Sequence, residues 1–239
     1  MRRWVWLGAL AIGFGLAAAV GVRGLRDTRP VLVCLGDSLT SCGGQGGRYS
    51  DWLARFMLYV RVIDAGVGGD TLMGGRARFE RDVLVHNPDI LVIALGANDF
   101  WQRNRPPEAL AADLEAMVRE ARSRSMQVVV ASCFGDRFFW EEPCVEFTPD
   151  RFALAREIAR LERRVCETHG AEYVPNMQID IKPNRLPPYW DKTDHPNRAG
   201  NEQVALRLLP AIRRAVELDG AKVSPYSEKA NSQQGYDKK

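Results

Sequence analysis

The sequence predicts an α/β fold in which a five-stranded parallel sheet is covered by helices on both faces. Five short apolar runs are typical of strands buried on both faces, and they cover residues 31–35, 60–65, 89–95, 127–132 and 172–174. Amphipathic segments separate these runs, as in parallel sheets, where each crossover between strands needs a helix. The length of 239 residues suits one such domain with additional terminal segments.

Four segments outside the strands carry helical signals, and they cover residues 49–59, 106–123, 148–170 and 198–218. The second begins with two prolines, which suit the first turn of a helix because the N–H that they lack has no partner there. In the third, Thr148 is the expected cap and Gly170 ends the helix. Pro210 is expected to bend the fourth helix.

Composition divides the chain into three parts. Residues 4–22 carry no charge and follow Arg2 and Arg3, which is typical of an export signal or a membrane anchor. A small-residue site at 17–19 suits cleavage, so a cleaved signal and an uncleaved anchor both remain open. We expect this leader with its linker over 1–29, one folded domain over 30–218, and a disordered polar tail over 219–239. Either kind of leader makes the domain an exported one, periplasmic, extracellular or held at a membrane.

The charge balance argues against a nucleic-acid partner. The 33 basic and 30 acidic residues give a net charge of +3, whereas nucleic-acid-binding domains are usually strongly basic. The five cysteines show no CxxC spacing typical of a metal site. Export would permit a disulfide, for which Cys133 and Cys144 are the best pair; buried unpaired thiols, as expected for Cys34 and Cys166, are the alternative.

Glycine and polar residues stand where the predicted strands end. They occupy residues 36–38, 66–71, 96–99 and, beyond the last strand, 191–197. Each segment alone suits a turn. Because the carboxyl ends of parallel strands meet at one edge of a sheet, we expect the four segments to converge there. The glycines at 43–47 do not form a phosphate loop, since no Gly-Lys-Ser/Thr follows them.

The motifs GDSLT (36–40), GGDT (68–71), GAND (96–99) and HPN (195–197) stand at these places. In order and spacing they resemble the four blocks of the GDSL, or SGNH, hydrolase family, and in particular its bacterial esterases, thioesterases and lysophospholipases. The resemblance extends over residues 30–218. It implies a flavodoxin-like three-layer α/β/α sandwich, the SGNH hydrolase fold, and a serine ester hydrolase that needs no metal or cofactor.

The resemblance also implies roles for particular residues. Ser38 would be the nucleophile and His195 the base that activates it. The backbone N–H groups of Ser38 and Gly69 and the side-chain amide of Asn98 would form the oxyanion hole. These residue types suit the chemistry, because a serine hydroxyl needs a base in hydrogen-bond reach and a tetrahedral intermediate needs donors aimed at its charge.

The other two histidines fit positions at helix ends. His86 precedes Asn-Pro, and His169 precedes Gly170. His195 is left as the candidate base, in a loop before the last helix.

The third member of the triad departs from the family's pattern. The family places an aspartate three residues before the histidine, where this chain has Lys192. Asp191 and Asp194 flank that position. We favour Asp191, since a helical turn brings side chains four residues apart to the same side. Asp194 is the rival, although adjacent side chains in an extended segment point apart.

Three functions remain open. The first is hydrolysis of acyl esters or thioesters, lysophospholipase-like or esterase-like, through an acyl-serine intermediate. The second keeps this chemistry for O-acetyl groups on carbohydrate or cell-wall material, and the third is a catalytically silent binding domain. The substrate would thus be a small-molecule, lipid or acylated-sugar ester. The aromatic residues at 138–140 would line an acyl pocket, touch a membrane, or simply pack over the sheet edge.

Overall fold

The computed structural model describes residues 27–102, 104–135, 148–178, 181, 189–191 and 195–218. The expectations for the leader, the polar tail, the aromatic residues 138–140, Cys144 and Asp194 therefore lie outside the described residues. Among the helices of the described ranges, none combines the length and the apolar character that a membrane crossing requires.

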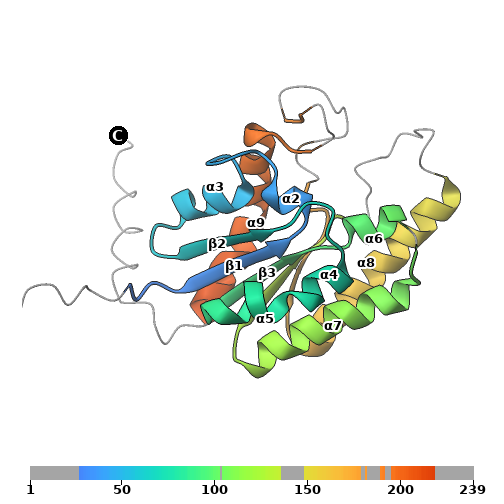
Figure 1. The fold of residues 1–239 in the computed structure, drawn as a ribbon, viewed down its shortest axis with the longest axis horizontal. Helices are drawn as coiled ribbons and strands as arrows, with labels where there is room; N and C mark the ends of the chain where they lie inside the picture. The colour runs from blue at the N-terminus through green and yellow to red at the C-terminus, as the bar shows by residue number, and fades with distance from the viewer. Residues whose placement is uncertain are drawn as a thin grey trace, which may run out of the picture.

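A five-stranded parallel sheet forms the centre of the molecule (Figure 1), which confirms the predicted fold class. Its strands are β1 (Val31–Gly36), β2 (Arg61–Gly66), β3 (Ile90–Ala94), β4 (Gln127–Ala131) and β5 (Glu172–Val174). Their order is β2-β1-β3-β4-β5, so the chain reverses direction across the sheet after β2. Open sheets of this kind bind ligands beyond the carboxyl ends of the strands at such a switch point.

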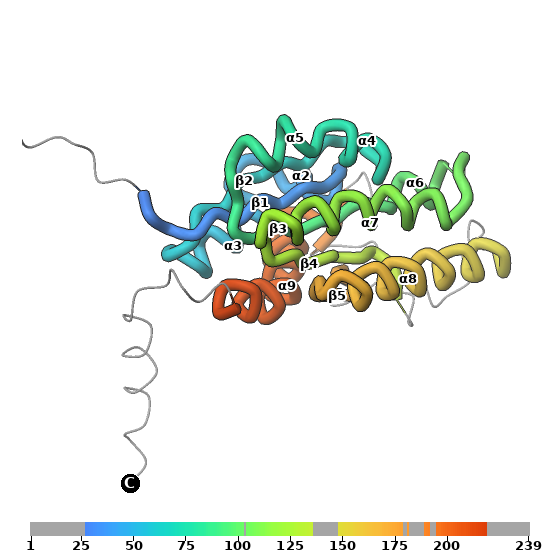
Figure 2. The backbone as a smooth tube through the Cα atoms, turned by 90° about the horizontal axis from the view of Figure 1, so that it is seen from below, coloured from blue at the N-terminus to red at the C-terminus, as the bar shows by residue number. Residues whose placement is uncertain are grey.

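Helices cover both faces of the sheet because alternate strand residues face opposite sides. On one face Leu32 and Cys34 pack against α3 (Tyr49–Phe56) and α9 (Arg198–Leu218). On the other face Val33 and Leu35 share a core with three helices: α4 (Leu72–Ala77), α7 (Pro107–Ser123) and α8 (Pro149–His169). Figure 2 shows α7 and α8 running side by side.

The long helices follow their sequence signals closely. Thr148 is the N-cap residue of α8, and Gly170 ends that helix at a φ of 65°, in the left-handed region that glycine favours. Pro210 lies inside α9. The helix expected over 49–59 is shorter than predicted, because Met57 leaves the helical conformation (φ −131°, ψ 67°).

Several short helices were not predicted, since three to six residues hold too little of a 3.6-residue period. They are α2 (Ser38–Ser41), α4, α5 (Phe79–Asp82), α6 (Ala97–Gln102) and a 3₁₀ turn over Leu84–His86. Three of them, α2, α4 and α6, follow strands β1, β2 and β3 directly or after a short loop. They therefore surround the edge at which the candidate site residues were expected.

Cys133 is a free thiol, and Cys144, its best candidate partner for a disulfide, lies outside the described residues. Cys34 and Cys166 are free and buried, as the alternative predicted. Cys42 is also free.

Candidate active site

Ser38 is the first residue of α2, immediately beyond the end of β1. The turn before it is held by Asp37, whose carboxylate accepts a 2.8 Å hydrogen bond from the backbone N–H of Leu39. Gly36 is needed for this turn: a Cβ there would lie 1.9 Å from Oγ1 of Thr40 and 2.8 Å from the carbonyl oxygen of Ala94. A glycine, a capping aspartate and a short helix thus fix the position of the Ser38 hydroxyl.

The imidazole of His195 lies against this hydroxyl, with Nε2 at 2.8 Å from Oγ of Ser38. His195 comes from the loop before α9, 157 residues away in the chain. Neighbouring residues anchor this loop, since Trp190 and Pro196 form an antiparallel bridge and Asn197 caps α9 by accepting from the N–H groups of Ala199 and Gly200. Two rigid elements, β1 with α2 and α9 with its cap, therefore bring a serine and a histidine within hydrogen-bond distance.

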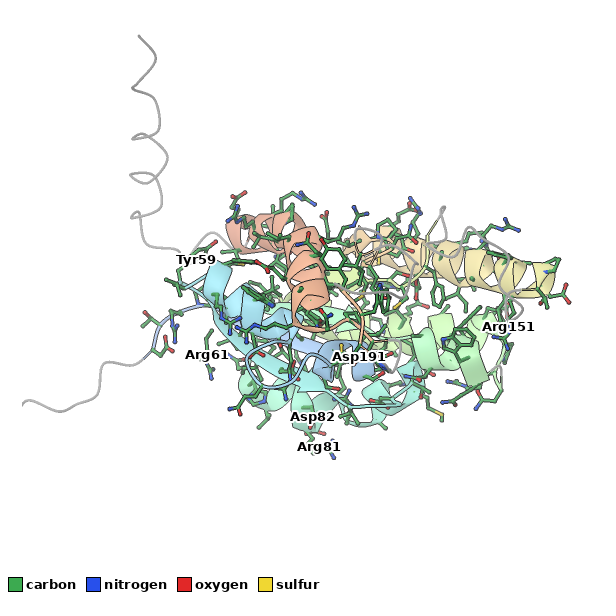
Figure 3. All side chains as sticks on the ribbon, turned by 90° about the horizontal axis from the view of Figure 1, so that it is seen from above. Tyr59, Arg61, Arg81, Asp82, Arg151 and Asp191 are labelled. Carbon is green, nitrogen blue, oxygen red and sulfur yellow. The ribbon has the colours of Figure 1, made fainter. Side chains whose placement is uncertain are left out.

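Asp191 lies in the same loop (Figure 3) and is bonded twice to His195. Its carboxylate oxygen accepts from the backbone N–H of His195 at 3.1 Å, and its own N–H donates to the carbonyl of His195 at 2.8 Å. These bonds close the loop and hold the carboxylate beside the histidine. The rival residue, Asp194, is outside the described part of the chain.

Asn98 and Gly69 reach the same edge from the segments after β3 and β2. The amide nitrogen of Asn98 donates to the carbonyl oxygen of Asp70 at 2.8 Å and to a carboxylate oxygen of Asp37 at 3.3 Å. Gly69 has a φ of 76°, and no atom lies within 4 Å of the place where a Cβ would stand. The Asn98 amide is therefore tied both to the Ser38 turn, through Asp37, and to the Gly69 loop, through Asp70.

Two buried carboxyl groups lie beneath these residues. Asp37 is 1% exposed, and burial raises its pKa to about 7, although the Leu39 N–H and the nearby His195 act in the opposite direction. Burial also raises the pKa of Asp99, which accepts from the N–H of Leu72 at 2.9 Å. Asp99 thus fastens α6 to the start of α4, behind the candidate oxyanion donors.

The remaining histidines lie at helix ends, as predicted. His86 is the last residue of the 3₁₀ turn. His169 ends α8, with Nε2 at 2.9 Å from a carboxylate oxygen of Glu115. In the described ranges no group of three or more His, Cys, Asp or Glu side chains is arranged to hold a metal ion.

Sequence reasoning missed two residues that support this edge of the sheet. Arg78, at the junction of α4 and α5, bonds to the ends of β1 and β2 and to Asp70. Glu162 of α8 is buried and accepts from the hydroxyl of Ser132, beyond β4. Neither stands at a strand end, and one arginine or glutamate in a helix of mixed charge carries no signal of burial.

The arrangement has the parts of a serine hydrolase: a hydroxyl, a base in contact with it, and amide donors on the adjacent segments. In such sites the base takes the hydroxyl proton as the oxygen attacks a carbonyl carbon. Donors fixed in advance then stabilise the negative oxygen that forms.

Comparisons with known proteins agree with this chemistry. A model of the GDSL-like Lipase/Acylhydrolase family matches residues 34–203, more than half of the chain. An acetylxylan esterase from Geobacillus stearothermophilus is 24% identical over an alignment of 213 residues that covers 76% of this chain and 93% of that protein. An arylesterase from Vibrio mimicus is 33% identical over an alignment of 119 residues that covers 45% of this chain and 58% of that protein.

Solved structures show the same fold. The crystal structure of TesA superimposes with a TM-score of 0.64 at 21% identity, covering 77% of this chain and 99% of that one. The family match, the named relatives and the fold together confirm the predicted family and reaction class. The chain belongs to the GDSL-like lipase/acylhydrolase family and is an enzyme that hydrolyses ester bonds.

Proposed function

We propose that Ser38 and His195 carry the hydrolysis through an acyl-serine intermediate. The observation that carries this proposal is the 2.8 Å contact between Oγ of Ser38 and Nε2 of His195. As Oγ forms a bond to the acyl carbon, its proton passes to Nε2. When the bond from that carbon to the leaving oxygen or sulfur breaks, His195 returns the proton to the leaving group. A water molecule then gives its proton to His195 and attacks the acyl carbon. As the bond from that carbon to Oγ breaks, His195 returns the proton to Oγ, which frees the acid and Ser38.

The oxyanion hole consists of the backbone N–H groups of Ser38 and Gly69 and the Asn98 amide. Supporting this, Asn98 is held by acceptors on both neighbouring segments, and the surroundings of Gly69 are open. Of the two Asn98 bonds, the 3.3 Å bond to Asp37 is the weaker, because N–H···O bonds are optimal near 2.9 Å. A substrate oxyanion therefore replaces this bond, while the bond to Asp70 keeps the amide in place.

Asp191 is the acid of the triad in this proposal, with Asp194 as the alternative. Both bonds between Asp191 and His195 are made with the histidine backbone, and they support the first by holding the carboxylate in the loop that carries the imidazole. Asp191→Asn and Asp194→Asn separate the two. We expect Asp191→Asn to lower kcat about 10-fold or more and Asp194→Asn to leave it within about twofold. The reverse result gives the role to Asp194, and unchanged activity in both variants excludes either from it.

The proposed substrates are acyl esters or thioesters, as in lysophospholipases and general esterases. The family description and the arylesterase relative support this class. A carbohydrate or cell-wall O-acetyl esterase is the second candidate, and a specific observation favours it: the relative that aligns over 93% of its own length is an acetylxylan esterase.

The folded domain is proposed to span residues 30–218 and to work outside the cytoplasm. Support for export comes from the uncharged stretch 4–22 after Arg2 and Arg3, which acts as a signal or as a membrane anchor. Membrane fractionation of the expressed full-length chain tests this. Recovery with membranes indicates an anchor, recovery as a shortened exported protein indicates a cleaved signal, and recovery of intact protein in the cytosol contradicts export.

The substrate proposal is tested with the purified full-length chain. Esters of one alcohol with acyl groups from acetyl to palmitoyl are compared with acetylated xylo-oligosaccharides, and Ser38→Ala is the control. We expect activity that rises beyond acetyl and disappears in Ser38→Ala. Activity confined to acetyl groups, and highest on the sugars, selects the second candidate instead.

A further inference from the structure

Arg78 is buried between α4 and α5, with 7% of its surface exposed, and its guanidinium makes four hydrogen bonds. Nε donates to the Asp70 carboxylate at 2.6 Å, and Nη1 donates to Asp82 at 3.0 Å. The other two bonds go to backbone carbonyls, from Nη1 to Ala65 at 2.8 Å and from Nη2 to Gly36 at 2.9 Å. One planar side chain is thereby bonded to four separate segments.

Two of these acceptors, Gly36 and Asp70, adjoin the proposed oxyanion donors. The carbonyl of Gly36 closes β1, two residues before Ser38. Asp70 directly follows Gly69, and its own carbonyl accepts the 2.8 Å bond from Asn98. Each of the three donors in the proposed oxyanion hole is therefore connected to the guanidinium through one or two residues.

We infer that Arg78 is a positioning residue of the active site, which sets the relative places of the Ser38 N–H, the Gly69 N–H and the Asn98 amide. This inference rests on the proposed roles of those three residues. Arg78 touches no substrate; it acts through Gly36 and Asp70. The strands alone do not fix the Gly69 loop, because Gly69 and Asp70 lie beyond the last paired residues, Gly36 and Gly66.

Lysine cannot replace arginine here, although it keeps the charge. The lysine ammonium donates all its hydrogen bonds from one nitrogen, whereas the three nitrogens of the planar guanidinium donate to acceptors in several fixed directions. Arg78→Lys therefore loses part of the set of bonds to Gly36, Ala65 and Asp70. Loss of one oxyanion donor typically costs about 10²–10³ in kcat, so we expect displaced donors to cost about 10–10².

Arg81→Lys is the matched control. Arg81 lies three residues along, pairs with the same Asp82, and has a side chain that is 74% exposed. Figure 3 shows it at the outer edge of the molecule. We expect its replacement to leave kcat within about twofold of the parent value, since exposed ion pairs contribute little.

The test measures kcat per active site, with sites counted by titration to completion with a fluorophosphonate, together with KM and thermal unfolding. We expect Arg78→Lys to lower kcat per site about 10–10²-fold with KM within about twofold. A merely structural arginine would lower the unfolding temperature and the number of titratable sites and leave kcat per site unchanged. That result would overturn the inference.

A double-mutant comparison with Asn98→Ala provides the second readout. If Arg78 acts by placing Asn98 and its neighbours, Arg78→Lys costs much less in the Asn98→Ala background than in the parent. If the fold-losses in kcat of the two single variants simply multiply in the double variant, the inference is contradicted. If Arg78→Lys does not fold, Asp70→Asn is measured in the same way. The two carboxylate oxygens of Asp70 accept from Nε of Arg78 and from the N–H of Thr71, and an asparagine side chain can accept only one of these bonds. If Asn98→Ala itself is fully active, the proposed oxyanion hole is wrong, and that outcome is distinct from failure of Arg78 alone.

Discussion

The amide nitrogen of Asn98 lies 3.3 Å from a carboxylate oxygen of Asp37, the residue directly before Ser38. The segment after β3 is thereby bonded to the turn that presents the Ser38 hydroxyl. A shorter bond, 2.8 Å to the Asp70 carbonyl, ties the same amide to the Gly69 loop. Asn98 thus stands between two segments of the site, which suits its proposed role as an oxyanion donor.

Replacing Asn98 by alanine removes this donor. We expect kcat for ester hydrolysis to fall about 10²–10³-fold with little change in KM, because the donor acts mainly on the charge that develops in the transition state. Steady-state kinetics on one ester measure the effect. Asn104→Ala, at an exposed position where the side chain contacts Gln102, is the control and is expected to behave as the parent. A loss expressed in KM alone would assign Asn98 to substrate binding instead.

Gly69→Ala and Gly68→Ala compare neighbouring positions that both have room for a methyl group. Only Gly69 has a left-handed φ, 76°, so alanine there costs about 1–2 kcal/mol of backbone strain. We expect Gly69→Ala to lower kcat/KM about 10-fold or more, because the strained peptide moves its N–H and the methyl group enters the open space. Gly68→Ala is expected to stay within about twofold. Equal effects of the two changes would remove Gly69 from the oxyanion hole.

Glu162 makes the stability of the fold depend on pH. It is 3% exposed, and burial raises its pKa from 4.5 to about 8, although the hydrogen bond from Ser132 opposes this rise. The folded protein therefore binds more protons than the unfolded chain between pH 4.5 and about 8, and this group's contribution to stability falls as the pH rises through that range.

The Glu162→Gln variant has no ionisable group at this position, so its stability does not fall in this way as the pH rises. We expect the free energy of unfolding of the variant, relative to the parent, to increase from pH 5 to pH 8.5 in urea titrations. Glu157→Gln on the same helix is the control, because the hydrogen bond from Arg160 lowers the pKa of the exposed Glu157, and its removal brings no gain at high pH. A difference between Glu162→Gln and the parent that stays constant with pH would show that Glu162 ionises normally in the folded protein.

The strands and long helices were predictable because their sequence signals are local. A buried strand reads as a short apolar run, and α8 is bounded by Thr148 before Pro149 and by Gly170 at its end. The convergence of Ser38, Gly69, Asn98 and His195 at one edge followed from parallel topology, since each stands at or beyond the carboxyl end of a strand.

Other features depend on contacts that no local pattern contains. Arg78 is bonded to Gly36, 42 positions earlier, so its burial becomes visible only once β1, β2 and α4 are assembled. The helix predicted to reach residue 59 ends at Phe56, where Met57 turns away and is fully buried. Sequence spacing left open whether Cys133 pairs with Cys144, because spacing along a loop says little about whether two thiols meet; in the structure Cys133 is a free thiol.

The central claim, that Ser38 is the nucleophile, is tested most directly by trapping the covalent intermediate. The full-length enzyme is treated with a slowly hydrolysed ester, quenched in acid, digested and analysed by mass spectrometry. We expect one acyl group per molecule on Ser38 and no adduct in Ser38→Ala. The fraction of enzyme that carries the acyl group is expected to rise as the remaining esterase activity falls. An acyl group on another residue, or full turnover by Ser38→Ala, would contradict the account.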